Sequence, residues 1–265
     1  MKLTKRITLL IFVLLVVIIF YGCDFIKVSE DFYETYQVEE GTVLEVDNRN
    51  GNINISGWDK DYVEVSAVKE SWRGRSDLEN AMIKVEETDK LLMETVHLTK
   101  NIQVSVHYDI KVPDGVDVNA AKSSNGSISL DRTAGNTAAV TSNGNITIKN
   151  VEGKVTARSS NGNIDIRGVE GLAEIETSNG NIKADLPRLE NDLHIETSNG
   201  SITLNIAENL DADIYAKTSN GKVTLHNLEI DIIHMDEKKL EGRTGDGRYR
   251  LTLTTSNGSI KLERL

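Results

Sequence analysis

Short runs in which apolar and polar residues alternate fill most of the chain after residue 118. Ile146 and Ile148 follow one copy of a recurring turn, and Ile164 and Ile166 follow the next. An alternation of period two is typical of a β-strand with one buried face. Helical patterning is rare, whereas Val, Ile and Thr are frequent in these runs. The pattern therefore predicts an all-β protein.

A four-residue motif, Ser/Thr-Ser-Asn-Gly, recurs seven times between these runs. Successive glycines are 18, 18, 18, 20, 21 and 37 residues apart, and residues 48–51 are an eighth, diverged copy. Each unit therefore holds two short strands, which are joined by a turn whose Asn and Gly both tolerate positive φ. The predicted structural-turn residues are Asn125, Gly126, Asn143, Gly144, Asn161, Gly162, Asn179, Gly180, Asn199, Gly200, Asn220, Gly221, Asn257 and Gly258.

Two all-β architectures fit this repeat. In a meander of antiparallel hairpins, Asn-Gly would form a two-residue type I′ turn. In a solenoid, each strand pairs in parallel with the same strand of the next coil. Near-identical coils stabilise this arrangement, because side chains of equal size form buried columns and Asn side chains form hydrogen-bonded ladders. We therefore predict a parallel β-solenoid with coils of 18–21 residues. One buried column should contain Ile146, Ile164, Ile182, Ile202 and Val223.

The remaining segments divide the chain into sections. These are a leader over 1–22, a tether over 23–40, a β-rich capping section over 41–118 and the solenoid over 119–265. The later part of the tether is expected to form a first strand, and Ser76 to cap a short helix. The capping section should cover an open sheet edge. Residues 229–248, rich in charge and glycine, are predicted to be an insertion loop in the last long coil.

The first 22 residues have the pattern of an export signal. Three basic residues precede a run from Ile7 to Tyr21 that is apolar except for Thr8 and shorter than the ~20 residues of a transmembrane helix. Gly22 and Cys23 follow, and this junction resembles a lipobox, in which the cysteine is acylated and becomes the mature N-terminus. An uncleaved signal anchor is the alternative. Both interpretations predict a body attached to the outer face of the cytoplasmic membrane.

Charge and cysteine content exclude several classes of protein. The net charge is −11, and removal of the leader with its three basic residues would make it −14. Such an acidic surface repels nucleic acid and favours a soluble, monomeric body. Cys23 is the single cysteine, so the chain can form no internal disulfide and no cysteine-based zinc site.

Several stretches together resemble the candidate-adhesin β-strand-repeat family, a domain of unknown function found in bacteria and archaea. The resemblance covers roughly residues 30–265 and is carried by residues 44–46 before 50–53, 56–59 with 63–65, 108–113 and 255–260. It implies a β-solenoid at the cell surface. Some members of the family resemble membrane-anchored components of envelope-stress systems.

Some β-helix proteins cleave polysaccharides, so paired acids on the outer faces matter. In stacked coils Glu176 and Glu196 would lie side by side. Two carboxylates at so short a distance repel each other, which raises the pKa of one of them, as in catalytic pairs. However, Arg158 and Lys217 fall in the same column, and alternating charges are usual on a solvated sheet face. A mixed-sign column on the opposite face contains Lys149, Arg167 and Asp185.

Other residues give little sign of chemistry. The five histidines show no metal-ligand spacing, and no phosphate loop or dinucleotide motif occurs. The repeated Asn could form a comb for a ligand or a structural ladder, and the ladder explains the repetition better. Trp58 and Trp72 are expected in the core of the capping section. We therefore predict no catalytic, cofactor-binding or metal site.

These observations predict a non-enzymatic, surface-anchored scaffold or adhesin-like binding module. Its flat sheet faces or residues 229–248 would contact an envelope protein or a polysaccharide. Two alternatives remain: an accessory regulator of an envelope-stress system, and a polysaccharide-active enzyme. The enzyme would require a cleft with converging acids.

Overall fold

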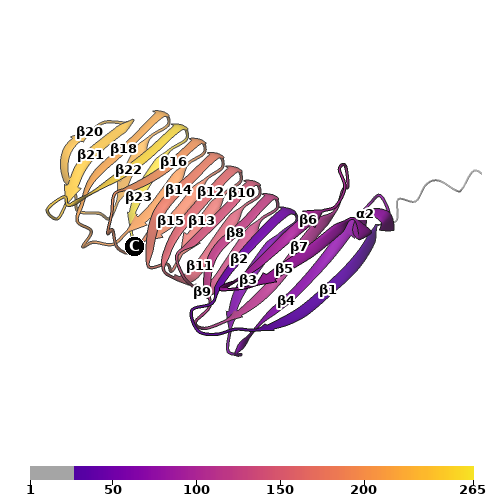
Figure 1. Ribbon diagram of the computed structural model, residues 1–265. Coiled ribbons are helices and arrows are strands. Elements are labelled where there is room, and N and C mark those ends of the chain that lie inside the picture. Colours follow the sequence, from indigo (N-terminus) through magenta and orange to yellow (C-terminus); the bar gives the residue numbers. More distant parts are fainter. Residues whose placement is uncertain (1–26) are drawn as a thin grey trace, which may run out of the picture.

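The computed structural model describes residues 27–265, so the predicted leader and Cys23 lie outside the described residues. The described chain is an elongated rod of stacked coils, with α2 at one end and β20 at the other (Figure 1). Coil after coil pairs in parallel and in register, as Ile146 does with Ile164 and Ile164 with Ile182. The parallel β-solenoid is confirmed, and the hairpin meander is wrong.

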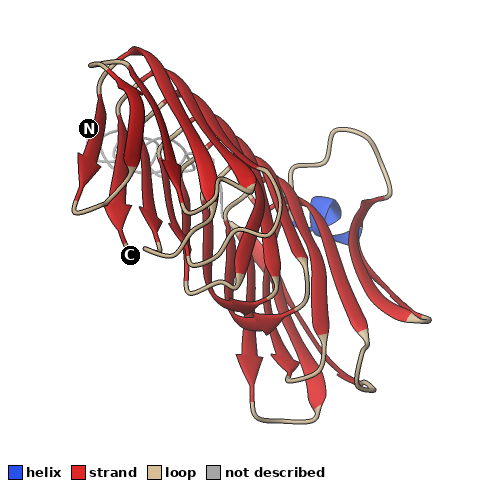
Figure 2. Ribbon diagram, turned by 90° about the vertical axis from the view of Figure 1, so that its left-hand side faces the viewer, coloured by secondary structure: helices blue, strands red, loops and turns tan. Residues whose placement is uncertain are grey.

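Each coil contributes one strand to each of two facing layers, whose edges are visible from the end of the rod (Figure 2). Layer A holds the strands that end at an Asn-Gly turn, together with the strands that extend their sheet. In spatial order it contains β5 (Ala81–Glu87), β6 (Lys90–His97), β2 (Val43–Asn50), β8 (Asp117–Asn125), β10 (Thr137–Asn143), β12 (Lys154–Asn161), β14 (Gly171–Asn179), β16 (Leu193–Asn199), β22 (Tyr249–Asn257), β18 (Ala212–Asn220), β21 (Lys239–Thr244) and β20 (Asp231–Met235).

Layer B holds the strands that follow the Asn-Gly turns and the three strands that extend their sheet at the N-terminal end. In spatial order it contains β1 (Val28–Gln37), β4 (Tyr62–Ser71), β7 (Ser105–Pro113), β3 (Ile53–Trp58), β9 (Ile128–Ala134), β11 (Ile146–Glu152), β13 (Ile164–Arg167), β15 (Ile182–Leu186), β17 (Ile202–Ile206), β23 (Ile260–Arg264) and β19 (Val223–His226).

Spatial order departs from chain order at both ends of the rod. The last coil, β22–β23, lies between β16–β17 and β18–β19, and the coil β2–β3 lies between β6–β7 and β8–β9. The five predicted apolar residues share one buried column, but Ile260 stands between Ile202 and Val223. The interval of 37 residues between Gly221 and Gly258 therefore covers the segment in which the chain continues from β18–β19 to the hairpin at the tip and then comes back to form β22–β23.

The predicted insertion loop at 229–248 is wrong. This segment contains the antiparallel hairpin β20–β21, and β21 pairs with the edge of β18. The backbone of Glu237 also accepts a hydrogen bond from Val223 N, and that of Lys238 accepts one from Thr218 N. The hairpin forms because β18 would otherwise end layer A with unpaired backbone groups.

Antiparallel strands also extend both layers at the N-terminal end. β4 pairs with β7 and β1 with β4 in layer B, and β5 pairs with β6 in layer A. The short helix α2 (Arg75–Glu79) follows β4. Its N-cap is Gly74 with φ of 107°, so the predicted cap at Ser76 is wrong. Among residues 27–265, no helix is long and apolar enough to cross a bilayer.

Close contact between coils, and not positive φ, explains the glycine of the repeated turn. A Cβ on Gly162 would lie 1.8 Å from the carbonyl oxygen of Gly144, and one on Gly200 would lie 1.9 Å from that of Gly180. Within the described chain none of the predicted turn Asn residues has positive φ, and among their glycines only Gly258 does. The prediction of positive φ at both residues is therefore wrong.

Gly162→Ala should destabilise the rod by at least about 2 kcal/mol, because the new methyl group meets backbone that cannot move alone. Gly171→Ala is the matched control, since its Cβ would meet nothing closer than Lys154 Cγ at 3.7 Å. Free energies of unfolding from urea titrations would measure both. Equal stability of the two variants would contradict the close-contact explanation.

A second prediction concerns Tyr108, which is buried in β7 and shares a 2.8 Å hydrogen bond with the Thr95 hydroxyl of β6 across the core. Burial raises its pKa to about 12, above the ~10 of an unfolded tyrosine. Its contribution to stability is therefore full below pH ~10 and is lost as the pH rises toward 12. Between pH 8 and 11 the wild type should lose about 1 kcal/mol more than Tyr108→Phe in urea unfolding.

Candidate functional site

The repeated Asn residues form one continuous ladder along an edge of the rod. Each Nδ2 donates to the Oδ1 of the Asn in the adjacent coil, at 2.7–3.0 Å. The ladder runs in spatial order through Asn50, Asn125, Asn143, Asn161, Asn179, Asn199, Asn257 and Asn220. The diverged copy at residues 48–51 thus joins the array through Asn50.

Two further ladders flank the amides. The Ser or Thr three residues before each glycine donates its hydroxyl to a glycine carbonyl of the adjacent coil, as Thr177 does to Gly162 at 3.0 Å. The Asn or Ser that follows the glycine in most coils accepts a backbone N–H, as Asn163 Oδ1 does from Asn181 N at 2.8 Å. Neither of these two ladders was predicted, although the Ser or Thr before each turn and the polar residue after each glycine mark them. Polar atoms of this edge are thus largely engaged within the rod.

Asn179→Ala should lower the free energy of unfolding by about 1 kcal/mol, because it removes the exposed amide bonds to both Asn161 and Asn199. Ser178→Ala is the control: this exposed neighbour makes no side-chain hydrogen bond within residues 27–265. If both variants unfold at the same urea concentration as the wild type, the ladder contributes nothing to stability.

The acidic pair on layer A forms as predicted, since Glu176 and Glu196 are register partners. Its predicted neighbour Lys217 does not join it, because Thr254 of the interleaved coil stands between Glu196 and Lys217. Arg158 lies beside Glu176 but forms its ion pair with Glu174, with Nε 3.0 Å from Oε1.

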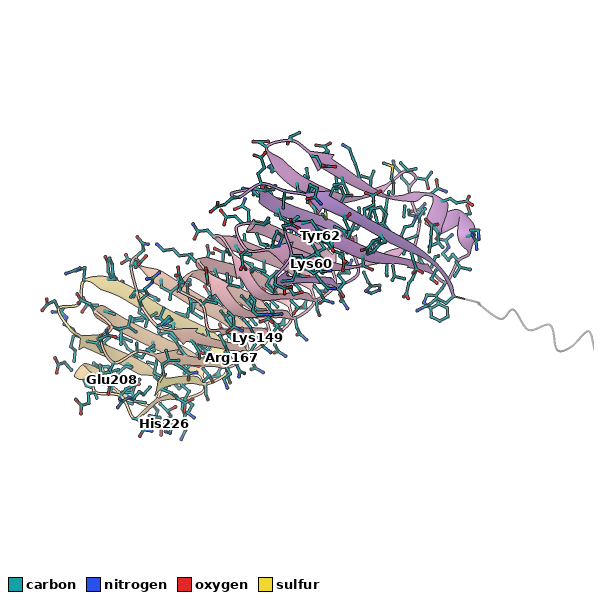
Figure 3. The ribbon with its side chains drawn as sticks, turned by 90° about the horizontal axis from the view of Figure 1, so that it is seen from below. Lys60, Tyr62, Lys149, Arg167, Glu208 and His226 are labelled. Atoms are coloured by element: carbon teal, nitrogen blue, oxygen red, sulfur yellow. The ribbon has the colours of Figure 1, made fainter. Side chains whose placement is uncertain are left out.

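Layer B also carries charges of both signs. Lys149 and Arg167, which are labelled in Figure 3, are register partners on adjacent coils. Arg167 lies 2.9 Å from both carboxylate oxygens of Asp165 in its own strand, and this pairing raises the arginine pKa. Arg167 and Asp165 are therefore paired charges on a solvated face, whereas Lys149 has no ion-pair partner within residues 27–265. Within residues 27–265, no cluster of His, Cys, Asp or Glu has the arrangement of a metal site.

The two tryptophans occupy different environments. Trp58 is half-buried, its Nε1 donates to Tyr62 O at 2.9 Å, and Lys60 Nζ lies 4.5 Å from its ring (Lys60 and Tyr62 are labelled in Figure 3). Trp72, in contrast, is 61% exposed. The prediction of a core position is therefore wrong for Trp72, because the chain turns outward between β4 and α2.

An open pocket of about 370 Å³ lies on the outer side of layer A near the tip. We call it the tip pocket, and its most distinctive lining residues are Tyr215, Ile233, Glu241, Arg243 and Arg250. The strands β18, β20, β21 and β22 bring these residues together, although the last lies 35 positions after the first in the sequence. The sequence alone does not reveal the pocket, because the charge and glycine content of residues 229–248 predicts a loop where β20 and β21 lie.

Cations surround the aromatic ring of the tip pocket. Lys239 Nζ lies 5.6 Å and the Arg250 guanidinium 5.9 Å from the centre of the Tyr215 ring, both in the range of cation–π attraction. Arg250 makes no ion pair within residues 27–265. Its guanidinium therefore retains hydrogen-bond donors for a ligand.

Two of the three carboxylates that line the tip pocket, Asp213 and Glu241, are held in their charged form. Arg243 pairs with Asp213 through two bonds of 2.6 and 3.1 Å, and this pairing lowers the Asp213 pKa. A hydrogen bond from Lys239 lowers the pKa of Glu241 in the same way. Neither carboxyl group is therefore protonated at neutral pH.

Comparison with known proteins matches residues 38–263 to one family, described as Toastrack DUF4097. No curated protein matches the chain. Among solved structures, it is similar to a candidate cell adhesion protein from Clostridium sporogenes, with 14% identity, a TM-score of 0.35 and coverage of 89% of this chain and 100% of the other. A candidate adhesin from Bacteroides fragilis has 15% identity, a TM-score of 0.44 and coverage of 88% and 97%. The family match spans most of the sequence, and the chain belongs to the Toastrack DUF4097 family.

Proposed function

We propose that the protein is an exported, membrane-anchored binding module that is not an enzyme and that uses the tip pocket to bind envelope polysaccharide. The observation that carries this proposal is the placement of the two ends. The described chain begins at Lys27 beside α2, and the hairpin β20–β21 lies at the opposite end of the rod (Figure 1). A chain attached through residues 1–26 would hold its tip pocket away from the membrane.

The chemistry of the tip pocket suits a polar polymer with hydroxyl groups. Tyr215 supplies an aromatic surface, Arg250 supplies donors and the ionised Glu241 supplies acceptors. Ile233, which is 69% exposed, adds an apolar contact for the less polar side of a sugar ring. A few convergent polar groups beside an aromatic side chain are typical of small-ligand sites.

The charged state of the carboxylates favours binding over cleavage. Glycosidases of the common type need one carboxylic acid with a raised pKa that can protonate the leaving group. In the tip pocket the pKa values of Asp213 and Glu241 are both lowered by neighbouring cations. This argues against either of these two carboxyl groups as the general acid of a polysaccharide-cleaving enzyme.

Tyr215→Ala and Arg250→Gln should each weaken binding of the full chain, in nanodiscs, to isolated envelope polysaccharide by about tenfold, which is the effect of losing one buried or charged contact. Thr254→Ala, on the flat face of β22, is the matched control and should bind normally. Co-sedimentation with the polysaccharide would measure the affinities. The envelope material would be tested both untreated and after digestion with a protease that is removed before the protein is added.

Two results would contradict the proposal. If Thr254→Ala weakens binding as much as the tip variants, the flat face and not the tip pocket is the contact surface. If protease treatment of the envelope material abolishes binding, the partner is an envelope protein, as the regulatory alternative requires.

A further inference from the structure

We propose that the N-terminal end of the rod rests directly on the membrane, through a surface that binds anionic phospholipid headgroups. This surface, the foot, consists of Lys27, Trp72, Arg73, Arg75, Leu98 and Lys100. The proposal depends on the membrane anchoring proposed above and adds to it a defined contact between the folded body and the lipid.

Two loops far apart in the sequence form the foot. One leads from β4 through α2, and the other leads from β6 to β7. Arg73 Nη1 donates to Asn101 O at 2.7 Å, and Leu98 N donates to Asn80 O at 2.8 Å. These bonds fix the loops side by side at the end of the rod where the grey trace leaves it (Figure 1).

The foot exposes the kinds of side chain that prefer a membrane interface. Trp72 is 61% and Leu98 56% exposed, in a protein whose other apolar side chains are mostly buried. Tryptophan is enriched at the level of the lipid headgroups, where its ring is apolar and its N–H meets water. Lys27 Nζ lies 6.0 Å from the Trp72 ring, so cation and aromatic group are presented together.

Basic side chains of the foot are free to contact lipid phosphates. Arg73, Arg75 and Lys100 are exposed, and none has an ion-pair partner within residues 27–265. Acidic groups near the foot include Glu30, which pairs with Lys69, Glu70, which pairs with Lys27, Asp77, which accepts Gln103 N, and Glu79. Three of the four cations of the foot therefore lack an ion-pair partner within residues 27–265, although the whole chain carries −11. Local attraction to an anionic leaflet follows within about one Debye length, ~10 Å.

The length of the leading segment requires the foot to lie near the membrane. Four residues lead from Cys23 to Lys27, and an extended chain spans at most ~3.5 Å per residue, which gives about 14 Å. An acylated Cys23 would therefore keep Lys27, and the Trp72 ring 6.0 Å from its Nζ, close to the headgroups. A signal anchor that extends beyond Cys23 would bring the foot closer still.

The test uses the full chain in lipid nanodiscs. The sequence has two tryptophans, so Trp58→Phe leaves Trp72 as the single reporter. With lipids brominated near the headgroups, Trp72 fluorescence should be quenched and blue-shifted in discs that contain phosphatidylglycerol. In the Trp58→Phe background, Arg73→Gln/Arg75→Gln/Lys100→Gln should lower the quenched fraction at least about fivefold, and high salt should act in the same direction.

A reporter at the tip is the matched control. Trp58→Phe/Trp72→Phe/Ile233→Trp should fold, because residue 233 is exposed, and its fluorescence should stay unquenched in the same discs. If Trp72 is as unquenched as this tip reporter, the foot does not contact lipid, and the anchored binding module stands without it. If the wild-type chain does not enter nanodiscs, and Cys23 takes up no labelled fatty acid in cells, the anchoring and the foot are both wrong.

Discussion

The rod depends on one constraint, the in-register approach of each coil to the next. Strand spacing in a sheet is ~4.8 Å, and at the repeated turn the backbones come so close that only hydrogen fits at the glycine Cα. This approach allows the Asn amides, the Thr hydroxyls and the Asn or Ser after each glycine to bond along the rod axis at the same time. The coils of the regular stack therefore carry the same Ser/Thr-Ser-Asn-Gly motif, because the same geometry recurs.

Because of this constraint, the sides of the rod and its two ends have different roles. Along the edge with the Asn ladder, polar atoms are engaged by the neighbouring coils, and several charges on the flat faces are paired, as in Arg158–Glu174 and Arg167–Asp165. At the ends, regular stacking stops, and side chains such as Trp72, Ile233 and Arg250 remain available. The tip pocket and the foot both lie where regular stacking stops. Their residues therefore differ from those of the repeat and from one another.

The repeat made the middle of the rod predictable, because each position there has an equivalent one coil away. The column from Ile146 to Ile202 and the Asn ladder follow from spacing alone. The ends were not predictable in this way. Tyr215 meets Arg250 only because β21 and β22 take places beside β18 that their order in the chain does not reveal. Likewise, the exposure of Trp72 depends on where β4 ends, and local composition does not specify that point.

The interleaved position of β22–β23 has a consequence for how the rod is completed. In the middle of the chain each coil pairs with a coil 18 residues away, whereas Asn257 must reach Asn199 across 58 residues and Asn220 across 37. Contacts between residues distant in sequence form slowly, because the intervening chain must first be closed into a loop. The coil β18–β19 precedes in the chain the strands β22 and β23 that join it to β16–β17. Regular stacking at the tip is therefore complete only after the last coil has taken its place between these two coils.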